Sequence, residues 1–142
     1  MTSPAQGSSD QGKMLFIDTS NEEAQVAYVL NGNVVQKHLW PIGPNAGKEV
    51  LEKINEILKK NNVKLREIEK VAVYCGPGKR SSALRSGIVA ASFLAFTGKT
   101  KLLISKTRKI DELGHATLSE PINGVVEPNY NNPGFDNNRK KL

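Results

Sequence analysis

Residues 71–96 constrain the fold of this chain more than any other segment. Residues 71–75 form a short apolar run, rich in β-branched and aromatic residues, that stops at the turn signal Gly76-Pro77-Gly78. Such a run is typical of a buried strand. Residues 81–97 then carry one charge, at Arg85, which is too few for a helix with one face on a core and the other in water. The segment therefore predicts a strand, a turn and a helix that is covered on two sides.

Two rows of side chains at helical spacing divide this predicted helix. One row could face a sheet and the other a neighbouring helix, because residues three and four apart share a helix face. Two interpretations of the second row are open: it is buried in the chain's own domain, or it is covered by a protein partner, which the small size of the chain favours. The first row holds Leu84, Ile88, Ala91 and Ala95, and the second holds Ser82, Ser86, Val89, Phe93 and Phe96.

Length and composition predict one folded unit with polar ends. The chain has 142 residues, enough for one domain with a real core. We expect a disordered tail or a cloning remnant at residues 1–12, a folded unit at residues 13–128, and a flexible basic tail at residues 129–142. The reason is that the two ends hold too few apolar residues to offset the entropy of ordering them.

The same composition disfavours several classes of protein. The sequence has no apolar run long enough for a membrane span and no secretory signal pattern, so we expect a cytoplasmic protein. One cysteine, Cys75, and two histidines predict neither an internal disulfide nor a zinc site. A net charge of +6 permits contact with RNA or an acidic partner, although a solvated face is the favoured interpretation of the lysines and arginines.

The hydrophobic pattern predicts a mixed sheet with flanking helices. Asn31-Gly32 is a type I′ hairpin signal between two of the strands. Two hairpins at the start, followed by a crossover through a helix, predict an α/β fold with a mixed five-stranded sheet. The pattern places strands at residues 13–18, 24–30, 34–39, 71–75 and 101–104, helices at 48–60 and 81–97, a short turn at 65–68, a weak helix at 107–113 and a further short strand at 123–126.

Two turns are candidate ligand sites, and for each a purely structural role is the favoured interpretation. Gly76 and Gly78 lie between a strand and a helix, where an anion can bind, but a tight turn that lets the helix pack close to the sheet is the better explanation. Asp18, Thr19 and Ser20 end a strand and could hold a metal or a phosphate, but a turn cap is commoner. No nucleophile, base and orienting group occur together, so we predict no catalytic residue and no metal ligand.

Three segments together resemble the TsaB (YeaZ) family, a bacterial subunit of the machinery that makes N6-threonylcarbamoyladenosine (t6A) in tRNA. They are Met14-Leu15-Phe16-Ile17-Asp18-Thr19-Ser20, residues 68–73 leading to Gly76-Pro77-Gly78, and Ala83-Leu84-Arg85-Ser86-Gly87-Ile88-Val89-Ala90-Ala91. The resemblance implies a short form with only the first lobe of the actin-like ATPase, RNase H-like fold. Residues 79–83 depart from the family's Ser-Phe-Thr-Gly turn, and too few residues follow Ile104 for a second lobe. We therefore expect no complete nucleotide cleft.

The resemblance also implies a role. We expect a non-catalytic subunit that dimerises with a TsaD-like partner, or with itself, and supports t6A formation in tRNA. ATP, magnesium, a TsaE-like ATPase and tRNA would then belong to the partner complex. Two alternatives are open: an actin-like nucleotide-binding enzyme that uses Asp18, Thr19 and the Gly76 turn, or an accessory protein that binds tRNA directly. The expected partner interface comprises Leu51, Ile54, Leu58, Ser82, Arg85, Ser86, Val89, Ala90 and Phe93.

Overall fold

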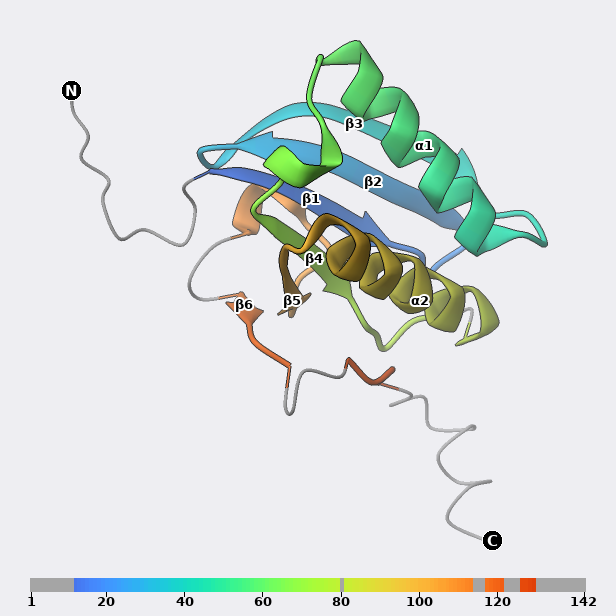
Figure 1. Cartoon of the computed structure of the whole chain (residues 1–142). Helices are drawn as coiled ribbons and strands as arrows, with labels where there is room; N and C mark the ends of the chain where they lie inside the picture. The colour runs from blue at the N-terminus through green and yellow to red at the C-terminus, as the bar shows by residue number, and fades with distance from the viewer. Residues whose placement is uncertain (1–11, 80, 114–116, 122–125, 130–142) are drawn as a thin grey trace, which may run out of the picture.

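A six-stranded mixed sheet forms the centre of the protein (Figure 1). The computed structural model describes residues 12–79, 81–113, 117–121 and 126–129. The strands lie in the order β3-β2-β1-β4-β5-β6. β1 pairs antiparallel with β2 and parallel with β4, and β4 pairs parallel with β5. The strands are β1 (Lys13–Asp18), β2 (Glu23–Leu30), β3 (Asn33–Pro41), β4 (Lys70–Tyr74), β5 (Lys101–Ser105) and β6 (Leu118–Ser119).

Two helices, α1 (Ala46–Lys60) and α2 (Ser81–Gly98), pack beside each other on one face of this sheet (Figure 1). Both are connections between strands, as the sequence predicts: α1 leads from the hairpins to β4, and α2 leads from β4 to β5. In the ranges that the structure describes, no helix is both long and apolar enough to cross a membrane. Two short 3-10 turns, η1 (Leu65–Glu67) and η2 (Ile110–Glu112), complete the described elements. The fold class predicted from the sequence is confirmed.

The alternation of side chains along the strands gives the sheet an apolar layer on each face. On the helix face, Leu15 and Ile17 of β1 are fully buried with residues of both helices. On the opposite face, Met14 and Phe16 pack with residues of β2, β4 and β5, and Ile110 of η2 lies against them. The core therefore explains why β1, at the centre of the sheet, is apolar on both faces.

The N-terminal part of the sequence prediction holds closely. The hairpin between β2 and β3 turns at Asn31 and Gly32, with φ angles of 50° and 83°. These are the positive values that a type I′ turn requires.

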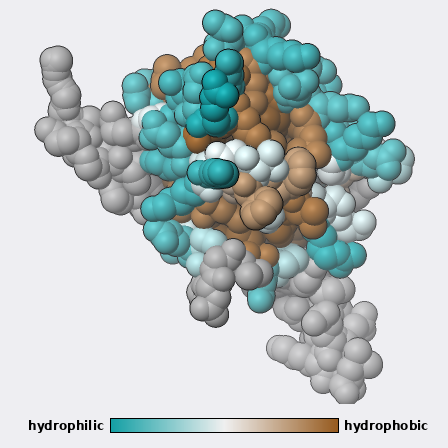
Figure 2. All heavy atoms as spheres, viewed as in Figure 1, coloured by the Kyte–Doolittle hydropathy of each residue, from teal (hydrophilic) through white to brown (hydrophobic). Residues whose placement is uncertain are grey.

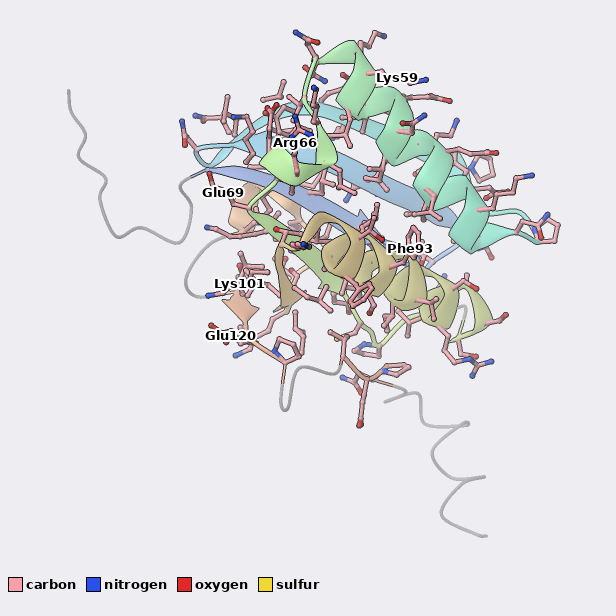
Figure 3. All side chains as sticks on the ribbon, in the orientation of Figure 1. Lys59, Arg66, Glu69, Phe93, Lys101 and Glu120 are labelled. Carbon is pink, nitrogen blue, oxygen red and sulfur yellow. The ribbon has the colours of Figure 1, made fainter. Side chains whose placement is uncertain are left out.

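The predictions fail beyond β5. The weak helix predicted at residues 107–113 is only the 3-10 turn η2, because its one apolar cluster, Ile110 and Leu113, packs on the sheet without a second helical turn. The sheet has a sixth strand, β6 at Leu118–Ser119, that the sequence did not suggest. Glu120 directly follows β6, and its Oε2 is ion-paired with Nζ of Lys101 in β5 at 3.0 Å (Figure 3). Of the short strand predicted at residues 123–126, only Val126 is described, and it is not in a strand.

Candidate functional site

Helix α2 exposes one of its two apolar rows. The row of Leu84, Ile88, Ala91 and Ala95 is buried against the sheet. In the other row, Val89 is 67% exposed, Phe93 55% and Phe96 85%. Of the two interpretations of this row, burial in the chain's own domain is wrong for the described residues, because α1 covers only part of it. Cover by a protein partner stays a prediction.

An apolar groove runs between α1 and α2. We call it the α1–α2 groove; its volume is about 640 Å³. Figure 2 shows apolar surface in the middle of the face that carries both helices, with hydrophilic side chains around it. The groove is lined by Gly47 and Leu51 of α1 and by Ser82, Arg85, Ser86, Val89, Ala90 and Phe93 of α2. Phe93 is labelled on α2 in Figure 3.

The structure brings together seven of the nine residues expected at the interface. Two others are corrected: Ile54 is 1% exposed and Leu58 is 7% exposed, and both belong to the chain's own core. They lie on the stripe of α1 that faces the sheet, whereas Leu51 lies on the side that faces α2. Helical periodicity places all three on one broad apolar face and does not tell which edge of that face stays accessible.

Gly47 is a lining residue that the sequence analysis missed. A Cβ added there would come within 3.5 Å of the Ser86 carbonyl oxygen, so the start of α1 lies close to α2. The sequence pattern places this glycine in a loop, and only its position before an amphipathic helix could have marked it. Arg85 is the single charged residue among the eight described residues that line the groove, which makes the groove an apolar surface with one cation at its side.

A second cluster lies where the parallel strands end. Because β1, β4 and β5 run parallel, their carboxyl ends meet at one edge of the sheet and bring Asp18 close to Arg108. Asp18 is 3% exposed, and its Oδ2 accepts a hydrogen bond from Arg108 Nε at 3.1 Å. Its Oδ1 accepts from the backbone N–H and the hydroxyl of Ser20, at 2.9 and 2.7 Å. These are the contacts of a buried turn cap.

Thr19 and Gly78 of this edge also contact other parts of the protein. Thr19 Oγ1 donates to the Ala83 carbonyl oxygen at 2.7 Å, at the start of α2. Gly78 packs directly on Ser20, since an added Cβ would lie 2.9 Å from the Ser20 carbonyl carbon. Gly78 and the strand end are therefore in direct contact, which agrees with the turn-cap and tight-turn interpretations.

Glycine is required at position 76, at the same edge, by the backbone conformation and by close neighbours. Its φ is +105°, a conformation that side chains rarely adopt. An added Cβ would lie 2.9 Å from Leu84 Cδ2 and 3.3 Å from the carbonyl carbon of Asn129. The N–H of Asn129 donates to the Cys75 carbonyl oxygen at 2.6 Å, so residues 126–129 return to the edge where β4 ends.

Burial shapes the chemistry of the two titratable side chains at the end of β4. Burial raises the pKa of the Tyr74 hydroxyl, the Asp18 carboxylate raises it further, and Arg108 lowers it. That hydroxyl donates to the Pro77 carbonyl oxygen at 2.9 Å. Burial also raises the pKa of the Cys75 thiol, which opposes formation of a reactive thiolate. This agrees with a core role for Cys75.

Comparison with known proteins connects this geometry to a family. The model of the family described as TsaD, tRNA N6-adenosine threonylcarbamoyltransferase, matches residues 45–105, a range that contains both helices. No curated protein sequence matches significantly.

Two solved structures from Pseudomonas aeruginosa match with the same values: YeaZ, and an uncharacterized protein with similarity to peptidase YeaZ. Each has a TM-score of 0.59 and 26% sequence identity, over 66% of this chain and 43% of the other. The chain thus spans less than half the length of the YeaZ chains that it matches. Together with the family match, this likeness supports the resemblance of the chain to the TsaB (YeaZ) family.

Proposed function

We propose that this chain is a non-catalytic TsaB-like subunit, which pairs with a TsaD-like protein through the α1–α2 groove and supports t6A formation in tRNA. The observation that carries the proposal is the exposed apolar row of α2. Val89, Phe93 and Phe96 are each more than half exposed, on one helix. Contiguous apolar surface of this kind marks interaction sites on proteins.

The chemistry of the groove suits a protein partner. Interfaces place apolar and aromatic side chains at the centre and polar groups at the rim, with arginine enriched. Phe93, Val89 and Leu51 supply the apolar centre, and Ser82, Ser86 and Arg85 supply polar groups. Burying one large apolar side chain contributes about 1.5–3 kcal/mol, so three such side chains represent a substantial driving force for association.

The comparisons support the choice of partner class. The TsaD-family match covers α1, β4, α2 and β5, and the YeaZ likeness covers two thirds of the chain. We propose that the functional unit is residues 13–128, that any ATP, magnesium or TsaE-like ATPase acts in the complex with the partner, and that tRNA is reached through that complex.

The test is the mass of the chain in solution, alone and mixed with a TsaD-type protein, measured by size exclusion with light scattering. We expect a mixed complex that is lost in Val89→Asp, because the carboxylate would be buried without a partner. Leu39→Asp is the matched control, since Leu39 is 47% exposed on β3, away from the groove. Ala90→Asp is unsuitable: Ala90 is 3% exposed and part of the core, so that variant would unfold the chain.

Each outcome decides between interpretations. Separate elution of the two proteins, or a complex that survives Val89→Asp unchanged, would refute the proposed interface. A dimer of the chain alone that Val89→Asp dissociates would assign the groove to self-association. The nucleotide alternative predicts submillimolar binding of ATP and magnesium in a calorimetric titration of the isolated chain, and the tRNA alternative predicts direct binding whose affinity falls steeply with salt.

A further inference from the structure

A second groove lies along the β3 edge of the sheet, away from α1–α2. In the described sheet β3 is the edge strand, nine residues long, and β2 pairs with it on its inner side. We call this the β3 groove. Its volume is about 690 Å³, and it is lined by Gln25 of β2, by Val34, Val35, Gln36 and Lys37 of β3, and by Arg108, Lys109, Ile110 and Asp111 around η2.

The groove reaches the main chain of β3. Four successive residues, Val34 to Lys37, line the same groove. The register against β2 shifts in this stretch, between Tyr28 and Val29, and leaves Val35 without a partner residue on β2. Such a β-bulge interrupts the alternation of side chains and leaves the extra residue outside the ladder, so main-chain groups of β3 are available at the groove. An edge strand carries a row of N–H and C=O groups that no neighbouring strand pairs, and such a row is a template for a further strand.

The opposite wall is held in place. Arg108 donates through Nε to the buried Asp18, and its carbonyl oxygen accepts from Gln25 Nε2 at 3.3 Å. Ile110 packs onto the apolar layer of the sheet. The groove is therefore largely formed before anything binds, which lowers the entropy that a ligand must overcome.

The lining residues define the chemistry of the ligand. Three of them are cationic, Lys37, Arg108 and Lys109, and one is acidic, Asp111; Arg108 is in addition ion-paired with Asp18 behind the groove. Apolar surface accompanies this charge, since the β3 valines at positions 34 and 35 are 42% and 45% exposed. A ligand that matches both features carries carboxylates and apolar side chains together. None of the nine described lining residues is aromatic, whereas single-stranded nucleic acid is usually held by stacking of its bases on aromatic rings.

We propose that the β3 groove binds an extended acidic segment of a partner protein, which adds to the sheet as a strand alongside β3. Main-chain hydrogen bonds to β3 supply affinity, and alternate side chains of the segment select for charge and apolar surface, as in other cases of strand addition. The site is separate from the α1–α2 groove. Its existence therefore does not depend on the proposed function.

The experiment is a nuclear magnetic resonance titration of the isotopically labelled full chain with a short capped peptide of alternating glutamate and valine. The control ligand is the same peptide with lysine in place of glutamate. We expect saturable shifts of the backbone amides of Val34 to Lys37 with the acidic peptide and none with the basic one. Lys37→Glu should weaken binding about tenfold through charge repulsion, and Lys37→Gln should weaken it by less.

Lys59→Glu is the matched control variant, because it makes the same change of net charge at an exposed residue near the end of α1, as Figure 3 shows. It should leave the peptide affinity unchanged. Absence of saturable shifts, equal binding of the basic peptide, or shifts confined to α2 would each overturn the proposal. Tighter binding of a uridine oligonucleotide at the same amides, weakened by Lys37→Glu, would overturn it in favour of a nucleic-acid site.

Discussion

The contact between Gly87 and Thr19 fixes the position of α2 on the sheet, and it makes a quantitative prediction. A Cβ added at Gly87 would overlap the Thr19 hydroxyl and lie 3.0 Å from Cγ2 and 3.1 Å from Cβ of the same residue. Thr19 is 1% exposed, and its hydroxyl donates to the Ala83 carbonyl oxygen. Thr19 is therefore too deeply buried to move into solvent and make room for the methyl group of Gly87→Ala.

Opposing terms determine the size of the effect. Alanine is favoured over glycine inside a helix by about 1 kcal/mol. Overpacking a tight core contact costs about 1–3 kcal/mol, and losing the Thr19–Ala83 hydrogen bond costs about 1 kcal/mol more. We expect Gly87→Ala to lower the free energy of unfolding by about 1–3 kcal/mol, although a helix propensity scale alone predicts the opposite sign.

A double-mutant cycle isolates this contact. In a Thr19→Ala background the hydroxyl and Cγ2 are absent, so Gly87→Ala should be neutral or stabilising by up to about 1 kcal/mol. Urea unfolding followed by the fluorescence of Trp40, the single tryptophan, measures all four proteins. Equal effects of Gly87→Ala in the two backgrounds, or a gain of stability in the wild-type background, would refute the argument that Gly87 is required by Thr19.

Two further predictions concern the edge where the parallel strands end. Asp18→Ala should cost about 2–3 kcal/mol because it leaves the buried N–H and hydroxyl of Ser20 unpaired, whereas Asp18→Asn should cost about 1 kcal/mol; equal losses in urea unfolding would contradict this difference. The raised pKa of Tyr74 means that the unfolded chain loses this proton first, so stability should fall as pH rises above about 10. Tyr74→Phe should flatten that alkaline fall in urea unfolding, and an unchanged slope would show that Tyr74 does not cause it.

The elements up to β5 could be predicted because local and global signals agree there. Asn31-Gly32 specifies a tight hairpin, and the apolar runs of β1 and β4 specify buried strands. The spacing of apolar residues in α1 specifies an amphipathic helix with one face exposed to solvent. The agreement ends after Ser105. The pattern at residues 107–113 is short and weak, and its apolar residues pack on the sheet from a 3-10 turn instead of a helix.

The sequence did not predict which apolar side chains of α1 are buried in the core and which line the groove. Ile54 and Leu58 lie on the same broad apolar face as Leu51, but they belong to the core and only Leu51 lines the groove. Two close approaches position the helices: Gly47 of α1 lies near Ser86 of α2, and Gly87 of α2 lies on Thr19 after β1. A single sequence contains these glycines without showing what each of them contacts.

The composition of α2 nevertheless indicates that one of its faces needs a cover. A helix that is apolar on all sides is stable only if all sides are covered, and the described residues form one sheet with α1 and α2 side by side on it. The structure uses one row of α2 for the core and leaves Val89, Phe93 and Phe96 at the surface. Replacing them with charged residues would cost the isolated fold little, since surface substitutions usually change stability by less than about 0.5 kcal/mol. Apolar side chains at such positions therefore support the proposed interface, and Val89→Asp should separate binding from stability.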